Sequence, residues 1–365
     1  MGVTVSLPFS IPFFPWSPPA SSTSAKETLL RRLKGSRVLI PNLYELLPGW
    51  RHGMNERYSS MHHEIDDWFC SWVKDDKERR RVIRADFASL AACLYPDAEP
   101  DEYRAMAFYH GWIFIWDDVV DDGHVDGLRA AQYHRETCDA VSWCLGSQPF
   151  SGPRPAMDGI MSAFAEISRT IVPHSSEDAR RRIHDELHAY INTAMWLQGK
   201  RKGEILTVQQ HLDQRHTSSG VLPSIALLEY IYRLDLPSSI IAHEATQVII
   251  NKTCLIIHLV NDIVSFPKEL GDNQVDNLIP LLVYHENLSV QEAVLRACAL
   301  VQEAHSAFMD AERRLPLTAA SDDQLQLLVR GCKDMATGMV HWSYLSARYY
   351  GENPVREGYK TFVQL

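Results

Sequence analysis

The sequence predicts an all-α fold of roughly ten to twelve helices in a single domain. From about Ser60 onward, apolar residues recur at three- and four-residue intervals, which is the period of an amphipathic helix. Segments rich in glycine and proline separate these stretches. Asp-Gly pairs occur, but no alternating apolar and polar runs flank them, so the sequence does not predict β-hairpins.

The apolar spacing places the expected helices in two groups along the chain. The first group covers residues 68–73, 87–94, 105–116, 128–145, 160–171 and 183–197. The second covers residues 225–232, 242–260, 278–284, 290–309, 325–340 and 342–350. The breakers that separate them fall at residues 96–100, 146–155, 173–176, 199–203 and 316–320.

The N-terminal segment differs in composition from the rest of the chain. Its first 24 residues are rich in proline, serine and phenylalanine and contain no lysine or arginine, so they lack the basic start of a secretory signal. No apolar run approaches the roughly 18 residues of a membrane span. We expect a flexible or loosely docked arm over residues 1–34, one domain over residues 35–365, and a cytoplasmic protein.

The overall composition is that of an ordinary globular chain with an acidic balance. Of the 365 residues, 45% are hydrophobic and 22% are charged, which is enough for a sizeable core. The formal net charge of −10 argues against a non-specific nucleic-acid binder, which needs a basic surface. Seven cysteines without a CxxC pair indicate thiols in a reducing compartment. We expect a monomer or homodimer without a nucleic-acid partner.

A row of oxygen-bearing side chains follows an apolar stretch near residue 260. Asn261, Ser265 and Glu269 recur at intervals of four, so they lie along one face of a helix. An amide oxygen, a hydroxyl and a carboxylate suit Mg²⁺ better than zinc or copper. The alternative is a merely solvated helix face. Pro267 cannot donate a helical hydrogen bond, and we expect it to bend the helix.

A second acidic feature ends the apolar segment 108–115. Asp117, Asp118, Asp121 and Asp122 follow it closely, although the last turn of a helix already carries negative dipole. Bound cations would relieve the repulsion. The members of each pair, Asp117/Asp121 and Asp118/Asp122, are one helical turn apart. Either pair could therefore be the one that faces the metal site. The alternative is an acidic turn that leads into a loop.

Together these features resemble the class I terpene synthases. Residues 117–121 resemble the DDxxD motif of that family, and residues 261–269 resemble its NDxxSxxxE motif. The two motifs lie close to 145 residues apart, as in the family. Arg348-Tyr349, with Trp342 six residues earlier, resembles the C-terminal arginine–tyrosine pair and its cavity tryptophan. Arg215 lies 46 residues before Asn261, where the family has a diphosphate-sensing arginine.

The resemblance implies a helical bundle around a central apolar cavity and a site that binds metal and diphosphate. It implies three Mg²⁺ ions, which act as Lewis acids on the leaving group. The implied metal ligands are Asp117, Asp118, Asp121, Asn261, Ser265 and Glu269. The implied diphosphate ligands are Arg215, Lys268, Arg348 and Tyr349. Of these, Asp117, Asn261, Ser265, Glu269, Arg348 and Tyr349 are the expected catalytic residues.

The carbocation formed on ionisation needs apolar and aromatic surroundings, since aromatic faces attract cations. Counting back from Asp117 by three, four and seven residues predicts Phe114, Ile113 and His110 on the cavity face of that helix. The remaining expected cavity and effector residues are Phe87, Ser218, Ser219 and Trp342. Ser218 stands where many relatives carry aspartate, and His211 where relatives commonly carry tyrosine. Ser219, Gly220 and Pro223 predict a helix break after Arg215.

The expected function is a Mg²⁺-dependent cyclase that converts farnesyl diphosphate to a sesquiterpene hydrocarbon or alcohol. Alternatives are a cyclase for a diterpene or another chain length, a chain-elongating prenyltransferase and a non-catalytic helical binding protein. A prenyltransferase carries two aspartate-rich motifs, so the row at residues 261–269 favours a cyclase. A histidine- and aspartate-rich stretch at residues 62–67 is interpreted as a solvated helix face. No GxSxG, GxGxxG or GxxxxGK[ST] motif supports another chemistry.

Overall fold

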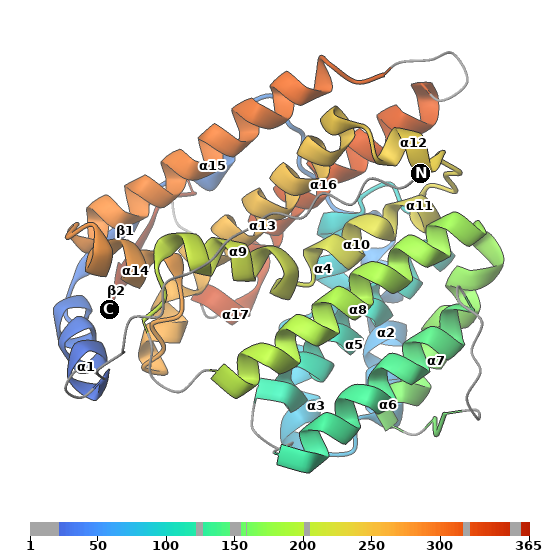
Figure 1. Ribbon diagram of the computed structural model, residues 1–365, viewed down its shortest axis with the longest axis horizontal. Helices are drawn as coiled ribbons and strands as arrows, with labels where there is room; N and C mark the ends of the chain where they lie inside the picture. The colour runs from blue at the N-terminus through green and yellow to red at the C-terminus, as the bar shows by residue number, and fades with distance from the viewer. Residues whose placement is uncertain are drawn as a thin grey trace, which may run out of the picture.

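The long helix α13 (Glu244–Gly271) is the element on which several middle helices and the C-terminal helices pack (Figure 1). The computed structural model describes residues 22–121, 127–146, 155–157, 159–200, 205–316, 322–350 and 359–365. Helices α9, α10, α14, α15, α16 and α17 all contact α13. Within the described ranges the chain is almost entirely helical, which confirms the predicted all-α class.

The elements follow one another along the chain in this order. The N-terminal part contains α1 (Ser22–Leu33), β1 (Arg37–Ile40), the 3₁₀ turn η1 (Leu43–Leu46), α2 (Tyr58–Trp72), α3 (Asp76–Ala85), α4 (Phe87–Leu94) and α5 (Pro100–Asp121). The middle contains α6 (Gly127–Leu145), α7 (Gly159–Ile171), η2 (Val172–His174), α8 (Glu177–Lys200), α9 (Val208–Ser218), α10 (Val221–Ala226), α11 (Leu228–Ile231) and α12 (Ser238–Ile241). After α13 follow α14 (Leu278–His285), α15 (Val290–Glu312), α16 (Asp322–Leu345), α17 (Ala347–Tyr350) and β2 (Thr361–Gln364).

Helix α13 is apolar because it runs through the interior. By length and composition it could cross a membrane, but 67% of its most apolar window is buried inside the fold, as expected of a core helix. It begins after His243, whose side chain accepts a hydrogen bond from the Ala245 N–H. The helix continues past Pro267 to Gly271, so the proline does not end it. A bend at this proline stays a prediction.

Helix α5 carries the aspartate motif on its last turns. It starts with Pro100 and has Asp101 and Glu102 in its first turn, a favourable start because the proline φ is preset and the acids face the positive end of the dipole. It packs against α2, α4, α7 and α8. Figure 1 shows α6 and α8 running side by side next to this layer. The last turns of α5 therefore lie close to α8, which contributes to the candidate site.

Four helices were missed because they bury few apolar residues, and one of them, α12, buries none. In α3 only Val82 and Ala85 are buried, and in α9 only His211 is buried, so neither shows an apolar period. Residues 22–33 of the expected flexible arm form α1, which buries Leu29 and Leu33 and contacts α14. That part of the arm is therefore docked on the fold. Residues 1–21 lie outside the described residues, and the division at residues 34 and 35 stays a prediction.

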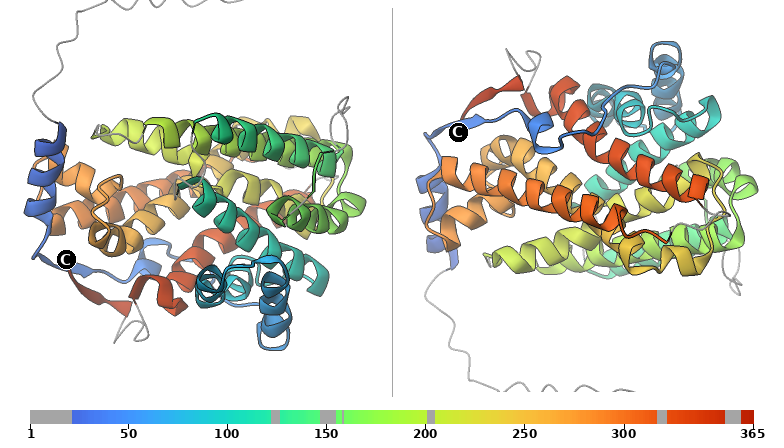
Figure 2. Two further views of the ribbon diagram at one scale, coloured as in Figure 1. Left: turned by 90° about the horizontal axis from the view of Figure 1, so that it is seen from below. Right: turned by 90° about the horizontal axis from the view of Figure 1, so that it is seen from above.

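Other differences concern the ends of helices and two short strands. The helix expected over residues 225–232 is divided between α10 and α11, and α16 runs unbroken through the break expected near residue 341. Strands β1 and β2 pair antiparallel, with Val38 opposite Val363. Figure 2 shows them beside each other near the C-terminus. Strands of four residues are too short to show a reliable alternating pattern.

Close packing of α4 against α16 makes a prediction about stability. A Cβ added to Gly338 of α16 would lie 2.2 Å from the Cys93 carbonyl oxygen, and a backbone atom cannot move aside. We expect Gly338→Ala to lower the free energy of unfolding by about 1–3 kcal/mol and to lower the midpoint of thermal unfolding. Gly271→Ala is the control, since nothing lies within 4 Å of its added Cβ. Equal midpoints for the two variants would contradict the packing argument.

Candidate active site

Arg215 of α9 lies between the two acidic motifs. Its Nη2 donates to Asn261 Oδ1 at 2.8 Å and lies 3.3 Å from Asp262 Oδ1. Burial lowers the pKa of this guanidinium, but the carboxylates of Asp262, Glu269 and Asp117 raise it overall. Arg215 therefore contacts α13 directly, and Asp117 of α5 adds to the negative charge that raises its pKa. Its place as the diphosphate-sensing arginine stays a prediction.

The row on α13 forms one connected polar network. Asn261 accepts from Arg215 and donates through Nδ2 to the Tyr349 hydroxyl at 3.0 Å. Ser265 is buried, and Glu269 is half-buried. Ser265 and Glu269 both lie near a side chain that sequence reasoning missed, Asn277, whose Nδ2 is 3.4 Å from Ser265 Oγ and 2.9 Å from Glu269 Oε2. The three predicted ligands are thus brought to one face of α13.

The chemistry of this donor set fits a hard divalent cation. It offers an amide oxygen, a hydroxyl and a carboxylate and contains no sulfur or imidazole. In the part of the chain that the structure describes, no three His, Cys, Asp or Glu side chains converge on a point, which agrees with a row holding a single carboxylate. Burial raises the pKa of Glu269, and nearby Asp262 raises it further. A bound cation would favour the charged carboxylate.

The aspartates of α5 have separate partners. The Tyr190 hydroxyl of α8 donates to Asp117 Oδ1 at 2.8 Å. Asp118 accepts a hydrogen bond from the Arg81 guanidinium of α3. The side chain of Asp121 lies outside the described residues, so its place in the site stays a prediction. Tyr190 and Arg81 were not predicted, because only the packing of α3 and α8 against α5 reveals them.

Cations gather on the side of the site formed by α17 and the end of α13. The Arg348 guanidinium lies over the Phe114 ring, 5.3 Å from its centroid. Lys268 is exposed as a whole, but part of its side chain is buried. This burial lowers the pKa of its ammonium group, and the positive charges of Arg348 and Arg81 lower it further. Three positive groups therefore repel one another here, which an anion would relieve.

Aromatic side chains connect this cationic side to the interior. The rings of Trp342 and Tyr349 meet edge to face, with centroids 5.6 Å apart. Phe87 and Phe114 lie with centroids 5.2 Å apart. Trp342 and Phe87 are buried, and Phe114 is half-buried. The predicted aromatics are thus neighbours of the predicted diphosphate ligands.

The helix break predicted after Arg215 is confirmed. Helix α9 ends at Ser218, and α10 begins at Val221, with Ser219 and Gly220 between them. Gly220 has φ +70°, a left-handed conformation that glycine adopts without strain.

The break also brings Gly220 close to α5 and α8. A Cβ at this position would lie 3.3 Å from Ile113 Cδ1 and 3.7 Å from Tyr190 Cε2. Ile113 therefore lies beside the break, and its predicted place on the cavity face of α5 stays a prediction. His110, expected on the same face, is buried and hydrogen-bonds to the Tyr95 hydroxyl at 2.9 Å. Burial lowers the pKa of His110 to about 3, so its ring is a neutral part of the core.

Asp262 holds α9 and α14 against α13. Its Oδ2 lies 2.6 Å from His211 Nε2 and accepts from the Leu278 N–H at 3.1 Å. Burial by itself would raise the pKa of Asp262, but His211 and Arg215 lower it to about 2. The carboxylate is therefore charged and fully engaged. His211, at the position where relatives commonly carry tyrosine, supplies one of its donors.

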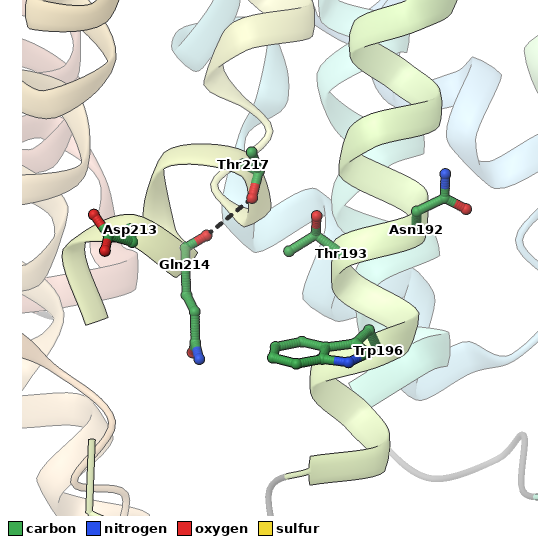
Figure 3. Close-up of a pocket in the computed structure, with 6 residues that line it drawn as sticks. All are labelled: Asn192, Thr193, Trp196, Asp213, Gln214 and Thr217. Atoms are coloured by element: carbon green, nitrogen blue, oxygen red, sulfur yellow. Dashed lines mark hydrogen bonds between the residues drawn. The ribbon is translucent and has the colours of Figure 1, made fainter. Parts of the chain in front are cut away.

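A separate pocket of about 440 Å³ lies between α8 and α9 (Figure 3). Its lining residues are Asn192, Thr193, Trp196, Asp213, Gln214 and Thr217. In Figure 3 the Thr217 hydroxyl donates to the Gln214 carbonyl, which ties the last turns of α9 together. None of these side chains was predicted as a site residue. One face of α9 thus lines this pocket, while Arg215 reaches toward α13.

Comparison with known proteins places this geometry in context. A family model described as terpene synthase family 2, C-terminal metal binding, matches residues 109–306. Terpene cyclase braA of Annulohypoxylon truncatum is 32% identical over 94% of both chains. Sesquiterpene synthase 3 of Postia placenta is 22% identical over 93% of both chains. A crystal structure of the linalool/nerolidol synthase of Streptomyces clavuligerus, 22% identical, superposes with TM-score 0.68 over 83% of this chain and 99% of the other.

The buried pair of His211 and Asp262 makes a testable prediction. In His211→Phe the buried Asp262 carboxylate loses a hydrogen-bond donor. We therefore expect the free energy of unfolding to fall by about 1–3 kcal/mol, with a lower midpoint of thermal unfolding. His211→Gln is the matched control, because its side-chain amide carries an N–H donor about as far from the backbone as the imidazole Nε2. If the phenylalanine variant unfolds at the temperature of the wild type, the pair does not stabilise the fold.

Proposed function

The chain belongs to terpene synthase family 2 and is a terpene cyclase, a lyase that acts on prenyl diphosphates, and we propose that its substrate is farnesyl diphosphate. The product is a sesquiterpene hydrocarbon or alcohol. The name of the Postia placenta relative, a sesquiterpene synthase, supports a fifteen-carbon substrate. The family's metal-binding region implies a divalent metal, and we assign it as Mg²⁺, with three ions.

One observation carries the proposal: the Arg215 guanidinium contacts the Asn261–Glu269 row, and its buried Nε–H has no partner among the residues that the structure describes. A site for a metal diphosphate needs acidic and amide oxygens for the cations and guanidinium donors for the anion within one space. The arrangement around Arg215 has both. A helical binding protein has no need to collect buried charges of both signs at the ends of two apolar helices.

The proposed ligands form two groups, one that would bind the metal cations and one that would bind the diphosphate anion. Asp117, Asp118 and Asp121 would hold two of the ions, and the α13 row would hold the third. These ions supply Lewis-acid stabilisation of the diphosphate leaving group. Asn261 Oδ1 accepts from Arg215 in this structure, so it exchanges that donor for an ion when the amide acts as a ligand. Arg215 is then free to bind diphosphate.

Unused donors on the arginines support the diphosphate assignment. The Nε–H groups of Arg215 and Arg348 are buried and have no hydrogen-bond partner among the residues that the structure describes. A buried donor without a partner costs free energy, which a phosphate oxygen would recover. Lys268 and the Tyr349 hydroxyl complete the proposed anion site. The planar guanidinium group of arginine can donate two hydrogen bonds to a phosphate at the same time.

The aromatic residues have a proposed role after ionisation. Phe114 already lies under the Arg348 guanidinium, so its face is directed toward positive charge beside the diphosphate ligands. Together with Phe87 and Trp342 it would stabilise the carbocation, and each such contact is worth about 2 kcal/mol when desolvated. Ile113 would shape the apolar wall. Ser218 and Ser219, at the end of α9, are proposed to link diphosphate binding by Arg215 to this wall.

Chain length is the part of the proposal that a direct assay decides. We expect incubation with ten-, fifteen- and twenty-carbon prenyl diphosphates and Mg²⁺ to give a cyclic product from farnesyl diphosphate. Gas chromatography with mass spectrometry identifies the products. A cyclic product from the twenty-carbon substrate alone would replace the proposal with a diterpene cyclase. Adding isopentenyl diphosphate tests the prenyltransferase alternative, because a longer diphosphate would then form.

The α13 row makes a prediction about metal-dependent turnover. Glu269→Ala removes the only carboxylate of the row, so we expect product formation to fall below detection while the helical circular dichroism spectrum is unchanged. Glu286→Ala, an exposed glutamate at the end of α14, is the control and should keep full activity. Product formation by Glu269→Ala at the wild-type rate would remove Glu269 from the metal site.

The position of Trp342 makes a prediction about products. Trp342→Ala removes a buried ring beside Tyr349, so we expect altered or earlier-terminated products, with pyrophosphate release retained. Chromatography and a pyrophosphate assay measure the two effects separately. The exposed Trp143 of α6 offers a matched control, and Trp143→Ala should give the wild-type products. A wild-type product profile from Trp342→Ala would assign the ring to core packing.

A further inference from the structure

Asn277 joins α13 and α14 through a single buried amide. It precedes α14 as the N-cap, and its Oδ1 accepts from the Ile279 N–H at 2.9 Å. The other half of the amide points to α13, where Nδ2 donates to the Asp262 carbonyl oxygen and to Glu269 Oε2, both at 2.9 Å. Only 1% of the residue is exposed. One side chain therefore caps one helix and fixes a carboxylate on another.

The position of this amide matters because the α13 row is long. Asn261 and Glu269, the two ends of the row, are about 12 Å apart along a helix that rises 1.5 Å per residue. Ser265 lies between them, so the Glu269 carboxylate has to fold back along the helix to share an ion with it. Asn277 Nδ2 lies within 3.4 Å of Ser265 Oγ and 2.9 Å of Glu269 Oε2, so it holds the carboxylate in the folded-back direction.

We propose that Asn277 is a positioning residue for the metal site, which holds Glu269 and Ser265 in the arrangement that a divalent cation needs. The inference rests on the proposed role of the α13 row. A neutral donor suits this task, since it fixes the rotamer of a carboxylate without neutralising it. A lysine or arginine at this place would form an ion pair that competes with the cation. Asn277 itself does not touch the metal or the substrate.

Two variants separate positioning from capping. Asn277→Ser keeps a good N-cap for α14 but is too short to carry an amide donor to Glu269. Asn277→Ala loses both functions. Ser289→Ala removes the N-cap of α15, which is far from the row in sequence and exposed, and so measures the cost of a lost cap alone. Circular dichroism checks that each variant is folded.

The readout is the Mg²⁺ concentration that each variant requires. We expect both Asn277 variants to need about 10–100-fold more Mg²⁺ for half-maximal turnover of farnesyl diphosphate, the usual cost of removing a partner of a metal ligand. We expect the same shift in an assay without turnover, namely the rise in the thermal midpoint caused by Mg²⁺ with inorganic pyrophosphate. Ser289→Ala should lower the midpoint and leave the Mg²⁺ requirement unchanged.

The outcomes distinguish this inference from the proposed function. If the wild type neither turns over nor gains stability from Mg²⁺ and pyrophosphate, the proposed function is wrong. If the wild type does both and Asn277→Ser needs no more Mg²⁺ than the wild type, only the positioning role is overturned. A lower midpoint or turnover number with an unchanged Mg²⁺ requirement also overturns it, because that is the effect of a structural residue.

Discussion

Compensation of buried negative charge by Arg215 is the constraint on which the candidate site depends. Apolar helices α5 and α13 bring acidic side chains into the interior, where a carboxylate without a partner is costly. One guanidinium serves Asn261 and Asp262 directly and lies in the field of Asp117 and Glu269. The packing of α9 against α13 thus follows from electrostatics as much as from apolar contact, since α9 buries only His211.

Asp262 and its neighbours show how adjacent residues can have opposite tasks. Asn261 and Asp262 are consecutive, yet the amide faces Arg215 and Tyr349, while the carboxylate faces His211 and the start of α14. The first is proposed to exchange partners on ligand binding, and the second is held by the fold. A rigid anchor beside an exchangeable ligand lets the site change partners without loosening the helix that carries it.

The sequence predicted those parts of the fold and site that depend on local periodicity. Most long helices and the α13 row follow from the spacing of side chains, and Arg215 follows from its offset within the family motif. Arg81, Tyr190 and Asn277 could not be found in this way. Each lies on an element whose own sequence gives no sign of the site, and only tertiary packing brings it to Asp118, Asp117 or Glu269. Helix α3, which carries Arg81, was itself missed because it is almost entirely charged.

The small sheet of β1 and β2 has a consequence for the way the molecule is made. It pairs residues 37–40 with residues 361–364, and the Tyr344 hydroxyl at the end of α16 accepts from the Leu43 N–H and donates to the Tyr359 carbonyl. Arg348 and Tyr349 lie between these two anchored points. Since translation proceeds from the N-terminus, β1 has no strand partner until residues 361–364 have been synthesised. The nascent chain therefore exposes one short strand edge until then, and it anchors the segment that carries the proposed diphosphate ligands Arg348 and Tyr349 only at that stage.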